Sequence, residues 1–202
     1  EILIGLVGSE MCIRDRLGKV QIITMNFGSF KEYDMSNRFF NMDLAGGAML
    51  DIGVYALSIV RSFLDEQPDE IVSQWKPSPT GSDEQATILL KNAQGQMATV
   101  ALSMHSKQPK RAMISLEKGY IEIMEYPRAD KAVIVDAESG AQTEITAGDT
   151  ADALYYEMQD MEQAVKSGDA SAMQLAYSRD VMEIMTKLRN CLLYTSDAAD
   201  EL

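Results

Sequence analysis

Apolar and polar residues alternate along much of the chain, which is the pattern of half-buried β-strands. The first such stretch, Lys19–Phe27, places Ile23, Met25 and Phe27 on one face. From Glu70 onward, short runs rich in Val, Ile, Thr and Met are separated by Gly, Pro, Asn and Asp. These runs predict strands over Ile71–Trp75, Glu84–Lys91, Gln96–His105, Arg111–Leu116, Tyr120–Met124, Ala132–Asp136 and Thr143–Thr146. Most connections are too short for crossover helices, so the sheet should be largely antiparallel.

Three segments have helical patterns. Ala48–Leu64 is apolar almost all round, which predicts a buried helix. Ala151–Lys166 and Ser178–Arg189 carry apolar, methionine-rich stripes that predict adaptable core packing. The stripes are Leu154, Met158, Met161 and Val165, then Val181, Met182, Met185 and Leu188. We therefore expect an α+β fold with an open-faced, mostly antiparallel sheet and helices packed on one face.

The two ends of the chain differ from the rest. Gly5–Arg16 and Cys191–Glu201 both match translated adapter ends from sequencing libraries. We therefore expect residues 1–16 and 191–202 to be artefacts and residues 17–190 to be the native part of the chain. The alternative is a natural N-terminal strand and a natural disordered tail. Both cysteines lie in these ends, so the remainder has no thiol for a disulfide or a cysteine nucleophile, which fits a cytoplasmic location.

The net charge of the chain limits the classes of partner that it can bind. A net charge of −13 repels phosphate backbones and anionic lipid, so nucleic acid and membranes are poor candidates. The short basic group at Lys107, Lys110 and Arg111 is expected to be a solvated loop. The single histidine, His105, cannot form a metal site alone, so we expect no metal and a solvated or interfacial imidazole.

The stretch LAGGAMLDIGVYAL, Leu44–Leu57, carries the most specific chemistry. Asp51 and Tyr55 lie four residues apart, which places both on one helix face. A buried carboxylate or phenol without a partner costs several kcal/mol, so such a pair has polar partners or lines a cleft. The preceding Gly46 and Gly47 allow the helix start to approach a backbone or ligand closely.

Spacing alone leaves alternatives open at each of these positions. Tyr55 could be a core tyrosine bonded to a carbonyl, and Asp51 could brace a neighbouring loop. Arg38 could contact a substrate oxygen or form an ion pair with Asp51, and the structural role ranks first.

This stretch resembles the active-site helix of the Gfo/Idh/MocA oxidoreductases, whose pattern is glycines, then Asp, then His or Tyr four residues on. The form DIGVY is similar to the branch that contains glucose-fructose oxidoreductase and dihydrodiol dehydrogenase. The strand order and the closing stretches YYEMQDMEQAVKSG and SRDVMEIMTKLR also resemble that family's C-terminal domain. The resemblance covers essentially all of residues 17–189, and it implies that residues 17–190 form a substrate and dimerisation domain.

The resemblance implies a two-domain enzyme acting on a sugar or cyclic polyol, with an N-terminal Rossmann domain that binds NAD or NADP. It implies that Tyr55 transfers a proton, that Asp51 orients the substrate and that subunits pair through the open sheet face; Arg38 is a candidate substrate contact. No G-x-G-x-x-G follows a strand, so we expect the Rossmann domain to be missing and the chain alone to bind no cofactor. The alternative is a non-catalytic α+β binding or dimerisation module.

Overall fold

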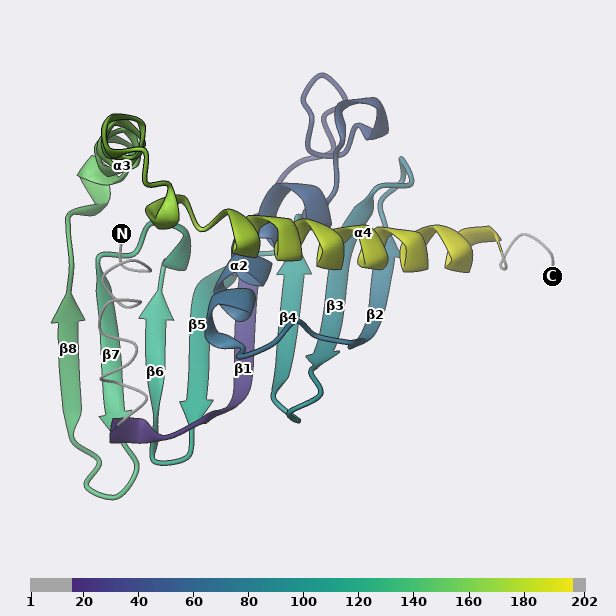
Figure 1. The fold of residues 1–202 in the computed structure, drawn as a ribbon. Coiled ribbons are helices and arrows are strands. Elements are labelled where there is room, and N and C mark those ends of the chain that lie inside the picture. The colour runs from purple at the N-terminus through teal and green to yellow at the C-terminus, as the bar shows by residue number, and fades with distance from the viewer. Residues whose placement is uncertain (1–15, 198–202) are drawn as a thin grey trace.

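An eight-stranded sheet forms the body of the protein (Figure 1). The computed structural model describes residues 16–197, so most of the segments predicted to be artefacts, residues 1–16 and 191–202, lie outside the described residues. The strand order is β2-β3-β4-β1-β5-β6-β7-β8. The strands are β1 Val20–Gly28, β2 Glu70–Pro77, β3 Asp83–Lys91, β4 Met97–Ser103, β5 Gln108–Leu116, β6 Gly119–Met124, β7 Lys131–Asp136 and β8 Gln142–Thr146.

The first strand lies in the middle of the sheet. β1 pairs in parallel with β4 and antiparallel with β5, and each of the other neighbouring pairs is antiparallel. The predicted mostly antiparallel sheet is therefore confirmed. Each predicted strand overlaps an observed one, because the hairpin connections leave the alternation of apolar and polar residues uninterrupted.

Helices cover one face of the sheet (Figure 1). They are the π-helical turn η2 Met49–Gly53, its continuation α2 Val54–Phe63, and α4 Leu175–Asp197. Arg61 of α2 forms an ion pair of 2.8 Å with Asp180 of α4, which joins the two helices. The core lies between these helices and the sheet, so the predicted α+β, open-faced fold is confirmed.

The stripe of α4 meets the sheet largely as predicted. Val181, Met185 and Leu188 are buried, and Ile184 is buried with them. Met182 is 55% exposed, so its predicted place in the core is wrong. The helix also continues past the predicted end at Arg189, to Asp197.

The predicted core role of the other helical stripe is wrong. In α3, Ala153–Ser167, the side chains of Leu154, Met158, Met161 and Val165 are 50–75% exposed. This helix lies at one end of the sheet, above β7 and β8 in Figure 1, so the stripe has no sheet beneath it. A helical period shows that one face is apolar but not what covers it.

One stretch of the described residues, Met42–Phe63, is long and apolar enough to span a membrane by composition alone. Of the window that meets this criterion, 56% is buried inside the protein, and the core helix of a soluble protein meets the same criterion. The stretch packs against the sheet through Leu57 and Val60, which are both fully buried. Its apolar composition is therefore accounted for by the core.

Replacing a leucine should destabilise the fold only where that leucine is in this core. We expect Leu57→Ala to lower the free energy of unfolding by about 2–5 kcal/mol, because Leu57 is fully buried. The matched control is Leu154→Ala, at a side chain that is 57% exposed, which should cost less than about 1 kcal/mol. Urea unfolding of both variants measures this, and equal losses would contradict the exposed position of α3.

Candidate active site

The helix that carries Asp51 and Tyr55 begins with a π-helical turn. Asp51 lies in η2, and Tyr55 is in the first turn of α2. The predicted helix over residues 48–64 is thus confirmed, with a wider first turn than an α-helix has. π-helical turns inside helices occur frequently at functional sites.

The two glycines before this helix make close contacts within the chain. A Cβ at Gly46 would collide with the backbone of Arg38 and Asn41. Gly47 has a φ of +123°, and a Cβ there would collide with the Asp83 carboxylate. The predicted close approach therefore occurs, and it brings the helix start against the preceding loop and β3.

Asp51 and Arg38 form an ion pair, as the favoured structural alternative for Arg38 predicted. The Asp51 side chain is only 9% exposed, whereas that of Arg38 is 56% exposed. The Arg38 guanidinium also lies 5.4 Å from the centre of the Phe39 ring. The pair therefore has one buried charge and one charge that still faces solvent.

Tyr55 lies beside this pair in the sequence but at the surface. Its residue is 47% exposed, and its hydroxyl makes no hydrogen bond to any group in residues 16–197. The alternative of a buried core tyrosine bonded to a carbonyl is therefore wrong. The Tyr55 ring leans on Phe27 of β1, with 6.1 Å between ring centres and an interplanar angle of 46°.

Phe27 forms an aromatic base below Tyr55. Tyr126 meets Phe27 edge-on at 5.9 Å, and the Lys110 Nζ lies 5.5 Å from the centre of the Phe27 ring. Lys110 belongs to β5 and forms an ion pair of 2.9 Å with Glu125, so its predicted place in a solvated loop is wrong. A cation therefore borders the site on the side of Phe27.

A pocket of about 140 Å³ opens one helical turn further along α2, at Ile59. Its lining includes Tyr126, Arg128, Asp149 and Glu157. The Tyr126 hydroxyl is buried without a hydrogen-bond partner among the described residues, and burial raises the pKa of this phenol. The pocket and the rings of Phe27 and Tyr126 together form a surface that runs from Tyr55 toward the start of α3.

Asp83, which the sequence analysis did not single out, binds the start of the site helix. Its carboxylate accepts a hydrogen bond of 2.5 Å from the Met49 amide, and the residue is 8% exposed. Burial raises the pKa of Asp83 to about 6, although the Met49 amide and the Arg189 charge oppose this. The sequence carried no signal for this role, because Asp83 lies outside the alternation of buried residues that Ala86, Ile88 and Leu90 form on β3.

Comparison with known proteins identifies the family. The model of the GFO/IDH/MocA C-terminal domain matches residues 9–122, more than half of the chain. The chain belongs to this family. The sequence resemblance is thereby confirmed, together with the fold class that it implied.

The similar curated proteins are dehydrogenases. Trans-1,2-dihydrobenzene-1,2-diol dehydrogenase from Danio rerio is 24% identical over 94% of this chain and 59% of its own length. D-xylose 1-dehydrogenase (NADP(+)) 2 from Haloferax volcanii is 28% identical over 84% of this chain and 53% of its own length. This Gfo/Idh/MocA chain therefore spans little more than half the length of these relatives.

The similar solved structures share the fold. A 3-ketoreductase from Actinomadura kijaniata, in complex with NADP and TDP-benzene, has a TM-score of 0.71 at 20% identity, over 89% of this chain and 55% of its own. Aldose-aldose oxidoreductase from Caulobacter crescentus, complexed with glycerol, has a TM-score of 0.65 at 19% identity, over 88% and 58%. At this identity the likeness establishes the fold of the Gfo/Idh/MocA domain alone.

The buried Asp83 should make stability depend on pH. Its folded pKa of about 6 lies above its usual value of 3.8, so its contribution is complete below about pH 4 and is lost as the pH rises through 6. Asp83→Asn keeps an oxygen acceptor for Met49 but cannot ionise. We expect the stability of this variant relative to the wild type to increase by about 2–3 kcal/mol between pH 4 and pH 7.5. Urea unfolding at both pH values measures the difference, and a constant difference would contradict the raised pKa.

Proposed function

We propose that the chain forms the substrate side of an NAD(P)-dependent oxidoreductase that acts on a sugar or cyclic polyol. The observation that carries this proposal is the half-exposed Tyr55, whose hydroxyl has no hydrogen-bond partner among the described residues, on the same helix as Asp51, whose carboxylate binds Arg38. The names of the relatives, a diol dehydrogenase and a xylose dehydrogenase, support the same reaction class.

The proposed role of Tyr55 is proton transfer. In the oxidation direction its deprotonated oxygen takes the proton of a substrate hydroxyl, and in reduction its O–H gives a proton to the carbonyl oxygen. A phenol has an ordinary pKa near 10, so this role needs positive charge nearby. In this proposal the cofactor domain supplies that charge, because the nearby cations Arg38 and Lys110 are already paired with Asp51 and Glu125.

The proposed role of Asp51 is to orient the substrate. Its buried carboxylate has a fixed direction because Arg38 binds it, and it can accept a hydrogen bond from a second hydroxyl of a diol. The exposed part of the Arg38 guanidinium is open to a substrate oxygen. These two contacts would present one hydroxyl to Tyr55.

The cofactor belongs to a separate domain in this proposal. NAD or NADP, when bound, accepts the hydride in oxidation and supplies it in reduction. The described residues have no glycine-rich turn between a strand and a helix that fits a pyrophosphate, so they do not supply a dinucleotide site. The exposed stripe of α3 is the surface that we propose packs against the cofactor domain.

Tyr55→Phe tests proton transfer in the full-length protein with its cofactor domain. We expect kcat to fall about 100- to 10,000-fold while KM for the substrate changes little, because the ring remains and only the proton carrier is lost. The matched control, Tyr155→Phe, removes a hydroxyl from a residue that is 61% exposed on α3 and should leave kcat unchanged. Steady-state oxidation of a panel of sugars and diols with NAD and NADP provides the measurement. A Tyr55→Phe enzyme of wild-type activity would favour the binding-module alternative.

We also propose that two copies pair through the sheet face that the helices leave open. Ile22, Leu89 and Met97 on this face are 39–45% exposed, and Val72 is 61% exposed. Ile22 pairs with Met97 and Val72 with Leu89, and the two pairs are connected through Thr99, which pairs with Leu89 two residues from Met97 on β4. A contiguous exposed apolar patch of this kind is typical of a protein interface.

Leu89→Glu should weaken this dimer, because it introduces two charges into the apolar interface. We expect the variant to elute as a monomer at concentrations where the wild type is dimeric, with an unchanged circular dichroism spectrum. The control Met182→Glu makes the same kind of change at a residue of α4 that is 55% exposed, on the helix side of the sheet, and should leave the dimer intact. Size-exclusion chromatography with light scattering measures both, and a Leu89→Glu dimer would contradict the proposed interface.

A further inference from the structure

The segment between β1 and η2, residues 29–48, carries Arg38 but has little regular structure. Its only helical turn, apart from the start of the site helix itself, is η1, Met42–Leu44. Backbone hydrogen bonds hold its beginning, where the Ser29 amide donates to the Ser103 carbonyl at 2.9 Å and the Lys31 amide to the Met104 carbonyl at 2.8 Å. The part that approaches Arg38 needs further anchors.

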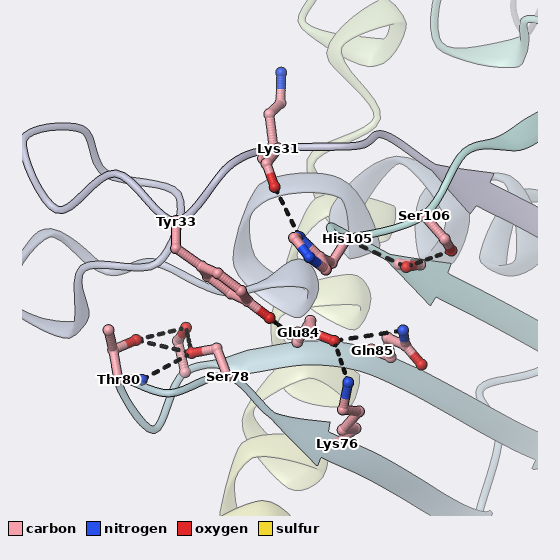
Figure 2. Close-up of polar contacts among 11 residues, drawn as sticks. Lys31, Tyr33, Lys76, Ser78, Thr80, Glu84, Gln85, His105 and Ser106 are labelled. Atoms are coloured by element: carbon pink, nitrogen blue, oxygen red, sulfur yellow. Dashed lines mark hydrogen bonds and ion pairs between the residues drawn. The ribbon is translucent and has the colours of Figure 1, made fainter.

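Glu84 supplies one of these anchors from β3. The residue is 1% exposed, and its carboxylate accepts hydrogen bonds from the Tyr33 hydroxyl and, at 2.7 Å, from the Lys76 Nζ (Figure 2). Burial alone would raise the pKa of Glu84, but these hydrogen bonds outweigh it and the pKa lies below its usual value. The charge is therefore kept in the protein interior by a partner on the loop and a partner on β2.

The Tyr33 ring is also held on its faces. It stacks on His105, with 4.4 Å between ring centres and an interplanar angle of 22°, and it contacts the fully buried Phe40 at 4.8 Å. The His105 Nδ1 lies 2.9 Å from the Lys31 carbonyl, so this nitrogen donates the hydrogen bond (Figure 2). His105 thus belongs to an aromatic cluster in which it is half-buried, and the expectation of a solvated or interfacial imidazole stays a prediction.

This cluster lies next to the residues that reach the site. Phe40 follows Phe39, whose ring contacts the Arg38 guanidinium at 5.4 Å, and the Thr80 hydroxyl donates to the Phe40 carbonyl at 2.5 Å. Arg38 in turn binds Asp51. Contacts therefore join Glu84 to Tyr33 and Tyr33 to Phe40, and the chain itself joins Phe40 to Arg38, which binds Asp51.

We propose that Glu84, acting through Tyr33, is a positioning residue for the Arg38–Asp51 pair. The buried carboxylate holds Tyr33, and Tyr33 with Phe40 holds the loop so that Arg38 meets Asp51 with its guanidinium facing solvent. This inference rests on the proposed function for its effect on substrate binding, but the anchoring itself is a property of the described chain. The segment that carries Arg38 is otherwise the least regular part of the site.

Tyr33→Phe tests the anchoring without opening a cavity, because Tyr33 is 43% exposed and its ring remains. We expect amide hydrogen exchange in residues 33–41 to become about tenfold faster, while the sheet and the midpoint of global unfolding stay as in the wild type. Tyr155→Phe is the matched control and should change exchange only within α3. Unchanged exchange in residues 33–41 would overturn the inference. Faster exchange throughout the sheet would also overturn it, because Tyr33 would then serve general stability.

Kinetics of the full-length protein test the effect on the site. We expect Tyr33→Phe to raise KM for the substrate about tenfold and to change kcat less than twofold, since the substrate contacts are displaced but Tyr55 is retained. As a single change, Glu84→Gln keeps an oxygen acceptor for the Tyr33 hydroxyl, so its KM should lie between those of the wild type and Tyr33→Phe. A loosened loop with wild-type KM would overturn the positioning role. A wild-type protein without dehydrogenase activity would refute the proposed function, and the exchange measurement would still decide the anchoring.

Discussion

The close contact between Gly47 and the Asp83 carboxylate determines where the site helix begins. Gly47 has a left-handed backbone, and any side chain there would collide with Asp83. The same carboxylate binds the Met49 amide. Since Asp51 and Tyr55 follow in helical register, this contact also fixes their height above the sheet. β3 therefore positions residues that precede it in the sequence, because Asp51 and Tyr55 lie 32 and 28 residues before Asp83.

Three buried carboxylates gather at this end of the sheet, and each has a different kind of partner. Asp51 binds an arginine, Asp83 a backbone amide, and Glu84 a lysine and a tyrosine. Removing one partner of a buried charge is far more costly than replacing both by apolar groups. These polar contacts therefore favour one arrangement of the loop and the helix, whereas an apolar surface would allow several.

The sequence predicted the sheet, because apolar and polar residues alternate wherever one face of a strand is buried. The Arg38–Asp51 ion pair was one of the alternatives that the sequence left open for Arg38. It did not predict the roles of Asp83 and Glu84, which depend on how the loop folds over the start of β3. Glu84 did carry a signal, since it shares the alternation of Ala86, the first of the buried apolar residues of β3. The exposure of α3 could not be predicted, because helical spacing is the same for a covered and an uncovered stripe.

The central position of β1 in the sheet affects how the domain folds during its synthesis. β1 ends at Gly28, but its neighbours β4 and β5 begin only at Met97 and Gln108. During synthesis, β1 therefore has no neighbour to pair with until β4 has left the ribosome, and its second neighbour, β5, follows later still. Pairing so distant in sequence slows folding. The segment around the candidate active site is thus the part of the nascent domain with the longest need for protection from aggregation.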